Sequence, residues 1–294
     1  MTSPRDTKPP WLRRKLPPGD ATAGLSAMVR DKALHTVCVE AHCPNQMECF
    51  SSGTATFLLL GPNCTRRCTF CAVGKAPAHP PDPDEPLRTA EAIAEMGVDY
   101  CVLTMVTRDD LPDGGARHVA RTLQAVRKRC PGIGVELLIS DLGGNRDSMQ
   151  IVLDAAPEVL NHNIETVPRL YPAVRPQADY RRSLHLLAIA AERHPSLITK
   201  SGLMLGLGES REEILECLDD LRESSCLLIT LGQYLAPSKR HHPVIRYVPP
   251  EEFAQYEAEA VHRGFLGAAS APLVRSSYRA ASLYRSARHR FPHW

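Results

Sequence analysis

The sequence predicts an α/β protein: a partial (β/α)6 barrel with extensions at both ends. Apolar, β-branched runs that are typical of buried strands recur along the chain. Amphipathic stretches of roughly ten to fifteen residues with helical periodicity lie between them. Strands that alternate with helices form a parallel sheet, because a parallel connection needs a crossover of that length. With 294 residues, of which 43% are hydrophobic, the chain is long enough to bury such a core.

Residues 1–53 are expected to form an N-terminal extension that wraps the barrel core. This segment is polar and contains a short amphipathic stretch at Ala21–Lys32. It also contains two pairs of prolines, Pro9 with Pro10 and Pro17 with Pro18.

Residues 54–250 are expected to form the barrel core. The predicted strands are Thr54–Leu60, Tyr100–Met105, Gly134–Ile139, Val159–Ile164, Leu197–Leu205 and Leu227–Tyr234. The predicted helices between them are Leu87–Met96, Gly115–Lys128, Ser148–Ala155, Tyr180–Arg193 and Arg211–Glu223. A closed barrel of this type has eight strand–helix units, so six units predict an open relative.

Residues 251–294 are expected to form a C-terminal segment. It begins with a helix at Glu251–His262 and continues as a tail with the tetrapeptide Arg275-Ser276-Ser277-Tyr278. A serine in this tetrapeptide is suited to be the N-cap of a helix at Ala280–Ala287.

Two cysteine triplets with different spacings lie in the first quarter of the chain. They are Cys38-x4-Cys43-x5-Cys49 and Cys64-x3-Cys68-x2-Cys71. Three thiolates at short spacing, offered twice, are typical of ligand sets for two iron–sulfur clusters, each one protein ligand short of four. Structural zinc is the main alternative, but zinc sites usually pair two short ligand pairs, and these triplets fit that pattern poorly. Four further cysteines, Cys101, Cys130, Cys217 and Cys226, are isolated and are expected to fill core or surface positions.

Composition restricts the setting in which the protein works. Met1–Pro18 has no apolar stretch and no cleavage pattern of a signal peptide, so we expect a reducing, cytoplasmic location with no disulfides. No run approaches the roughly eighteen apolar residues that span a bilayer, so no membrane association is expected. The net charge of +2 is too small to indicate a nucleic-acid partner.

The second triplet, Cys64-Thr-Arg-Arg-Cys68-Thr-Phe70-Cys71, resembles the cluster loop of the radical S-adenosylmethionine (SAM) superfamily, whose core is a TIM-type barrel. The resemblance implies a [4Fe–4S] cluster held by three cysteines, with SAM on the fourth iron. Phe70 is then expected to face the adenine, or else to pack beneath the loop.

In such barrels the reactive groups lie where strands end at their carboxyl termini. Asn163 and Glu165 alternate onto one side of a strand end and are expected to contact SAM. Gly206, Gly208 and Glu209 follow another strand and are candidates for the same role, because glycine lets backbone approach a ligand closely. A plain turn is the alternative for this glycine pair.

The first triplet and the tail tetrapeptide together resemble the lipoyl synthase family, and the similarity covers nearly the whole chain. Further segments similar to that family are Val106–Gly115, His162–Tyr171, Ser201–Met204, Gly232–Leu235, Lys239-Arg240 and Arg246-Tyr247. The turn Ser140–Gly144 and the stretch Arg279–Ala281 depart from the family's usual pattern.

This resemblance implies an enzyme with two [4Fe–4S] clusters that uses SAM to add two sulfur atoms, at C6 and C8, to an octanoyl-lysine. The cluster of Cys64, Cys68 and Cys71 cleaves SAM, and the auxiliary cluster of Cys38, Cys43 and Cys49 is the sulfur donor. A tail serine completes the auxiliary cluster. We assign this ligand to Ser277, with Ser276 as the second choice.

The resemblance also implies partners: an octanoylated carrier domain, of the glycine cleavage H protein or E2 subunit type, and an electron donor. The basic segment Lys239–His242 is either a solvated surface or a contact for an acidic carrier. Two alternative functions stay open. One is another sulfur-inserting radical SAM enzyme, similar to biotin synthase or to a methylthiotransferase. The other is an iron or zinc protein without catalytic activity that only binds a carrier.

Overall fold

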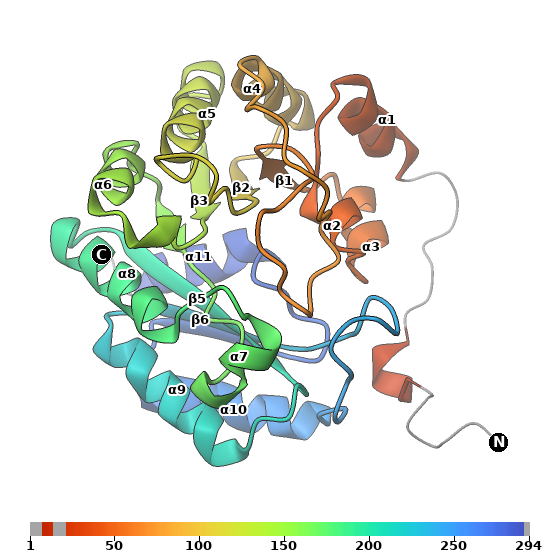
Figure 1. Cartoon of the computed structure of the whole chain (residues 1–294), viewed down its shortest axis with the longest axis vertical. Coiled ribbons are helices and arrows are strands. Elements are labelled where there is room, and N and C mark those ends of the chain that lie inside the picture. The colour runs from red at the N-terminus through yellow and green to blue at the C-terminus, as the bar shows by residue number, and fades with distance from the viewer. Residues whose placement is uncertain (1–7, 14–21, 291–294) are drawn as a thin grey trace.

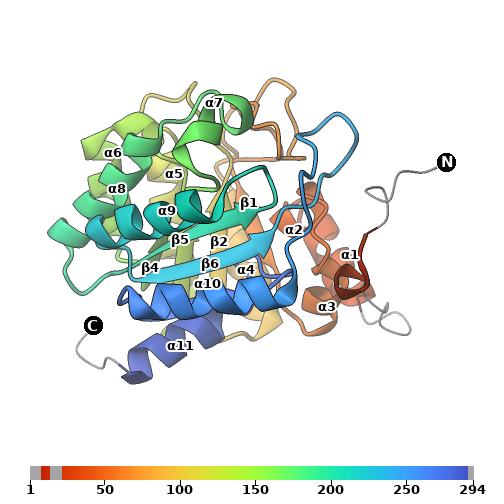
Figure 2. The ribbon, with the colours of Figure 1, turned by 90° about the horizontal axis from the view of Figure 1, so that it is seen from below.

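The structure is a computed structural model that describes residues 8–13 and 22–290. A single parallel sheet curves around the centre of the molecule, and helices cover its outside (Figures 1 and 2). The seven strands are hydrogen-bonded in chain order: β1 (Thr56–Leu59), β2 (Tyr100–Met105), β3 (Gly134–Leu138), β4 (Val159–Asn161), β5 (Ile198–Leu205), β6 (Leu228–Gln233) and β7 (Gly267–Ser270).

The predicted class is confirmed, with one strand more than expected. All six predicted strands are present, although β4 ends at Asn161 and not at Ile164. β7 was not predicted and lies in the segment 251–294, where it pairs with β6. The boundaries of the three predicted segments remain a prediction.

The outer helices are those that the periodicity indicates. They are α4 (Glu85–Met96), α5 (Ala116–Arg129), α6 (Arg146–Asp154), α8 (Tyr180–Arg193), α9 (Arg211–Glu223) and α10 (Pro250–His262). Side-chain caps fix several starts: Asp179 accepts from the backbone of Arg182, and Ser210 and Glu213 form a capping box at α9. Shorter helical turns are η3 (Leu142–Gly144), η4 (Pro168–Leu170) and α7 (Tyr171–Val174).

The N-terminal extension lies against the first strand. It contains η2 (Pro10–Leu12), α1 (Ala23–Asp31), α2 (Val37–Glu40) and α3 (Gln46–Ser51). The backbone of Leu58 in β1 donates to the carbonyl of His35 at 2.8 Å, which fixes α2 beside the sheet. Ala21, the first residue of the predicted amphipathic stretch, lies outside the described residues, as do Pro17 and Pro18 of the extension.

The last helix, α11 (Ala280–Arg290), packs across the amino ends of the strands. Ala280 packs on Tyr100 and Val102 of β2, and Ala287 packs among residues at the starts of β4, β5 and β6. The rings of Tyr284 and Tyr100 lie 5.3 Å apart. The amino ends of the strands are therefore closed, and the opposite end is left for the site.

A buried ion pair lies in the barrel interior. Lys200 Nζ donates to both oxygens of Glu136, at 2.8 and 2.9 Å, and both side chains are at most 1% exposed. Asn161 Nδ2 and the Tyr100 hydroxyl donate to the same carboxylate, at 2.9 and 3.2 Å. The carboxylate therefore has several partners, as a buried charge requires.

Lys200→Met is expected to destabilise the fold by about 3–5 kcal/mol, because it leaves the Glu136 carboxylate buried without its cation. Denaturant unfolding measures this loss. The double variant Lys200→Met with Glu136→Gln removes both charges but keeps an acceptor for Asn161 and Tyr100, and should recover part of the stability. Equal instability of the single and double variants would contradict this account.

Candidate active site

One cavity of about 540 Å³ holds every cysteine of the two triplets in its lining. The lining also includes residues at the carboxyl ends of the strands, such as Thr104 and Met105 of β2 and Gly232 and Gln233 of β6. The tail residues Arg275–Tyr278 complete it. The two triplets and the tail tetrapeptide, which are far apart in sequence, therefore lie around one space.

The second triplet lies in the loop that follows β1. Backbone bonds tie this loop to its neighbours: Cys64 N donates to the Gly74 carbonyl at 2.9 Å, and Thr69 N donates to the Val174 carbonyl at 3.0 Å. Burial raises the pKa of Cys68 and raises the pKa of Cys71 to about 11. Nearby Arg175 and Lys75 oppose the shift at Cys68. Bound iron would hold these thiols as thiolates.

The first triplet is arranged by α2, α3 and the turn between them. The Thr36 hydroxyl caps α2 by accepting from Val39 N, and Cys38 lies in the following turn. Cys43 N donates to the Cys38 carbonyl at 3.1 Å, which holds these two residues together. Burial, with a smaller contribution from the neighbouring Cys43 and Cys49, raises the pKa of Cys38 to about 12.

All these cysteines are free thiols. Within residues 8–13 and 22–290, no three His, Cys, Asp or Glu side chains converge as ligands of a single metal ion. A [4Fe–4S] cluster has irons at separate corners, so its protein ligands do not have to converge on one point.

The tail reaches the cavity along β6. Gln233 N donates to the Pro272 carbonyl at 3.1 Å. Gly232 is required for this approach, because a Cβ there would collide with the carbonyl oxygen of Val274. Beyond it, Asn45 Nδ2 donates to the Leu273 carbonyl and the Tyr278 hydroxyl donates to Glu48 Oε1, both at 2.7 Å. The tail is thus bound to the segment that carries the first triplet.

Asn163 and Glu165 lie together in the cavity, as expected from their spacing. Asn163 Nδ2 donates to Glu165 Oε1 and to Ser276 Oγ, both at 3.2 Å. Glu165 has a φ of +67°, which is unusual for a residue with a side chain and is typical of functional sites. Burial raises its pKa, and Arg175 and the Asn163 amide oppose that shift.

Phe70 also lines the cavity, next to Cys71. Gly206, Gly208 and Glu209 do not belong to the lining of this cavity. The Glu209 carboxylate accepts from the backbone N–H groups of Gly206 and Leu207 at 2.5 and 2.9 Å, so it closes its own loop. A role for these three residues in cofactor binding remains a prediction.

Three buried residues of the site were not among the candidate site residues, although Arg66 and His162 stand in segments that resemble the family. Arg175 donates through Nη1 to the carbonyls of Asn163 and Ile164, both at 3.1 Å, and so supports the strand end that carries Glu165. Burial lowers the pKa of His162 to about 4, so its ring is neutral at physiological pH. Because a carbonyl can only accept, His162 Nδ1 carries the proton and donates to Ile139 at 2.9 Å. Arg66 is the third of these residues.

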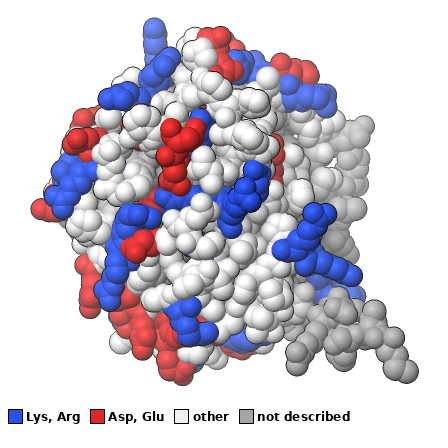
Figure 3. Space-filling model, viewed as in Figure 1, with Lys and Arg blue, Asp and Glu red and all other residues white. Residues whose placement is uncertain are grey.

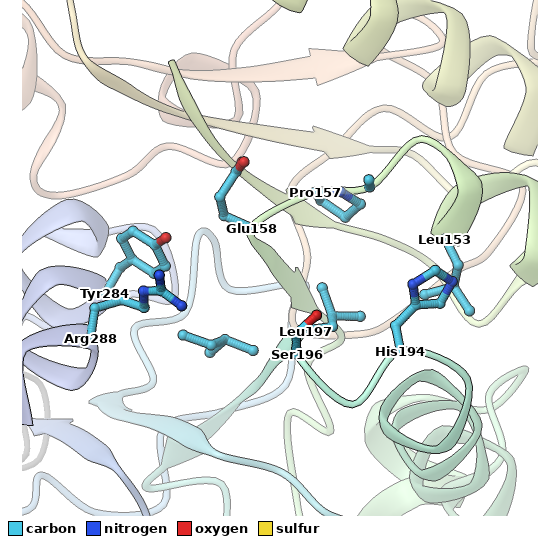
Figure 4. A pocket seen from close by; sticks show the side chains of 10 residues that line it. Leu153, Pro157, Glu158, His194, Ser196, Leu197, Tyr284 and Arg288 are labelled. Atoms are coloured by element: carbon cyan, nitrogen blue, oxygen red, sulfur yellow. The ribbon is translucent and has the colours of Figure 1, made fainter. Parts of the chain in front are cut away.

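A second cavity, of about 350 Å³, lies at the amino ends of β4 and β5, where Leu197 and Ile198 line it. Figure 4 shows Tyr284 and Arg288 of α11 on one side and Glu158 on another. Glu158 accepts from Arg127 and from the backbone of Val135, at 2.9 and 2.7 Å. This end of a barrel generally serves stability. The cysteine cavity is therefore the candidate active site.

Comparison with known proteins agrees with this geometry. The sequence profile of the Radical SAM superfamily matches residues 58–221. A lipoyl synthase of Desulfotalea psychrophila is 52% identical over 280 residues, which cover 95% of this chain and 94% of that protein. A lipoyl synthase of Chlorobium chlorochromatii is 54% identical over 281 residues, covering 95% and 96%. The chain belongs to the lipoyl synthase family.

Solved structures support the fold alone. The hydrogenase maturase HydG is 15% identical with a TM-score of 0.56, covering 83% of this chain and 55% of that one. SuiB of Streptococcus suis bound to S-adenosylmethionine is 12% identical with a TM-score of 0.55, covering 74% and 52%.

The family fixes the cofactors as SAM and two [4Fe–4S] clusters. The lining of the cavity fits these groups. It provides two sets of three free thiols. It also provides Asn163 Oδ1, which is among the buried polar atoms that lack a hydrogen-bond partner in the part of the chain that the structure describes.

No helix within residues 8–13 and 22–290 is long and apolar enough to span a membrane.

Proposed function

We propose that this lipoyl synthase family enzyme divides its work between the two triplets of one cavity. As a radical SAM sulfurtransferase, it inserts two sulfur atoms into a protein-bound octanoyl group. The observation that carries the division is the shared lining: Cys38, Cys43 and Cys49 face the same space as Cys64, Cys68 and Cys71. When bound, the two clusters supply an electron for SAM cleavage and sulfide for the new C–S bonds.

The reaction requires a carbon radical, because C6 and C8 of an octanoyl chain are too weakly acidic for any side-chain base. The protein contributes orientation and exclusion of water. Apolar side chains at the strand ends, including Leu58, Met105 and Leu203, line the cavity and are suited to an acyl chain. Asn163, Glu165 and Arg175 are the groups proposed to hold SAM.

The direct test is incubation of the anaerobically reconstituted protein with SAM, a reductant and an octanoyl-lysyl peptide. Mass spectrometry should show the gain of two sulfur atoms on the peptide. Iron analysis of the same sample should give about eight irons per chain. Cleavage of SAM without sulfur on the peptide would contradict the proposed function.

We propose Ser277 as the tail ligand of the auxiliary cluster. The bonds from Asn45 to Leu273 and from Tyr278 to Glu48 bring the tail to the first triplet on both sides of this residue. Ser276 instead accepts from Asn163, on the side of the proposed SAM site. A serine oxygen is a hard ligand, poorly matched to iron in a thiolate-bound cluster, and this suits a cluster that gives up its sulfide.

Ser277→Ala is expected to lower sulfur insertion at least about tenfold while SAM cleavage continues, because only the auxiliary cluster loses a ligand. The measurement is sulfur-containing product and 5′-deoxyadenosine per chain. Ser276→Ala is the matched control and should keep most sulfur insertion. A reversed order of the two variants would assign the ligand to Ser276.

The carrier domain is proposed to dock on a basic rim, defined as Lys8, Lys75, Lys239 and Arg240. Lys8 and Lys75 line the cavity, and Lys239 and Arg240 lie two and three positions after Pro237, which also lines it. His242 N donates to the Thr69 carbonyl at 2.9 Å, so this segment lies against the cluster loop. The loop after β6, light blue at the right of Figure 1, lies where the charged side chains in Figure 3 are blue. An acidic carrier surface is its complement.

Reversing both charges, with Lys239→Glu and Arg240→Glu, is expected to raise the KM for the intact carrier domain about tenfold and to weaken its salt dependence. The KM for a short octanoyl-lysyl peptide should not change. The exposed pair Lys128 and Arg129, on the last turn of α5, gives a matched control by the same reversal. Equal effects of the two double variants would refute docking of the carrier on the basic rim.

The electron donor is proposed only as a low-potential reductant.

A further inference from the structure

Arg66 lies within the cluster loop, between Cys64 and Cys68, yet its side chain turns away from solvent and is only 6% exposed. Its guanidinium bridges two carboxylates. Nε and Nη2 donate to Asp109, both at 2.8 Å, and Nη1 and Nη2 donate to Asp141 at 2.9 and 2.6 Å. The neighbouring Arg67 is exposed. Two adjacent arginines of one loop therefore have opposite environments.

The two carboxylates come from the ends of two neighbouring strands. Asp109 follows β2 and Asp141 follows β3. Asp141 has a fully buried carboxylate, which also accepts from Arg182 Nε of α8 at 2.9 Å. Arg66 thus connects the loop after β1 to the loops after β2 and β3, and through Asp141 to an outer helix.

A second set of bonds ties the same loop to the strand end at β2. Thr65 N and its hydroxyl both donate to the Thr107 carbonyl at 3.0 Å. Asp109 N in turn donates to the Thr65 hydroxyl at 3.0 Å. The backbone between Cys64 and Cys68 is therefore held from two directions.

Bidentate arginine–carboxylate pairs restrict distance and orientation together, which a single contact does not. Opposite charges also compensate within the group, since Arg66 and Arg182 face Asp109 and Asp141. The double bridge centres on the one segment whose thiols must lie at a fixed place relative to SAM.

We propose that Arg66 is a positioning residue: its double bridge to Asp109 and Asp141 sets the place of Cys64 and Cys68, and hence of their iron, relative to bound SAM. This inference rests on the proposed role of that triplet. Arg66 itself does not touch the reacting atoms.

The test uses the full-length protein with Cys38, Cys43 and Cys49 changed to alanine, so that only one cluster gives a signal. Arg66→Gln and the matched control Arg67→Gln are compared in this background. The readouts are iron per chain, the electron paramagnetic resonance spectrum of the reduced cluster, and the SAM concentration that produces half of its SAM-dependent change. A role limited to fold stability would not alter this concentration in protein that has kept its iron.

For Arg66→Gln we expect about four irons per chain and a SAM requirement at least about tenfold higher, because the iron is displaced. Arg67→Gln should match the parent. Equal SAM requirements in the two variants overturn the inference. Absence of any SAM-dependent change in the parent instead overturns the proposed role of the triplet, which separates the two failures.

If Arg66→Gln does not load iron, Arg66→Lys is used to test the inference. Lysine keeps the charge but does not bridge two carboxylates in bidentate fashion. A SAM requirement raised at least about threefold supports the inference, and an unchanged one overturns it. Asp141→Asn, which weakens the second half of the bridge, should also raise the SAM requirement.

Discussion

Cys68→Ala is expected to abolish SAM cleavage, and with it sulfur insertion, down to the background of the assay. The variant would retain two of the three thiols proposed to hold the iron beside SAM, so the electron should no longer reach the sulfonium. Iron content should fall from about eight to about four per chain, because the other triplet is unchanged. Quantifying 5′-deoxyadenosine and iron in one anaerobic preparation measures both effects.

Cys130→Ala is the matched control for that experiment. Cys130 is a half-buried free thiol at the end of α5, outside the lining of the cavity. Its replacement should leave iron content and SAM cleavage unchanged. If Cys68→Ala cleaved SAM as fast as Cys130→Ala, the triplet would not hold the catalytic iron.

Cys43→Ala separates the two halves of the reaction. SAM cleavage should continue, because the loop after β1 is unaffected, but the sulfur-containing product should fall below about a hundredth of the parental amount, since the proposed donor cluster loses a ligand. Iron content again drops by about half. Mass spectrometry of the octanoyl-lysyl peptide, with 5′-deoxyadenosine measured in parallel, gives both quantities.

An equal loss of SAM cleavage and sulfur insertion in Cys43→Ala would contradict a division of labour between the triplets. His42→Ala is a suitable control, because His42 is an exposed neighbour that also lines the cavity. It should retain both activities. A deficit in His42→Ala as deep as that of Cys43→Ala would indicate damage to the whole extension.

The regular core could be predicted closely from the sequence. Tyr180–Arg193 and Arg211–Glu223 have the predicted bounds, because a capping side chain and a periodic apolar stripe mark their starts. β7 could not be predicted in this way. It consists of glycine, alanine and serine, and small residues are needed there, since a Cβ on Gly267 would lie 2.9 Å from Leu283 of α11.

Some residues of the site could likewise be predicted from the sequence, and others could not. The cysteines and the pair Asn163 and Glu165 come together because their short spacings already imply a shared location. Arg66 and its partner Asp141 are 75 positions apart, so no window of sequence reveals the contact. The predicted end of β4 was too late, because pairing with β3 and β5 stops at Asn161, and Ile164 N then donates to the Ser201 hydroxyl and not to a strand carbonyl.

The arrangement of the tail has a consequence for the order of biosynthesis. Leu273–Tyr278 meets Asn45 and Glu48 only after more than two hundred intervening residues have left the ribosome. The loop of Cys64–Cys71, in contrast, makes its contacts with Thr107 and Val174 much earlier in translation. The space around the first triplet is therefore completed late, and a nascent chain that stalls before the tail emerges lacks the contacts that close it.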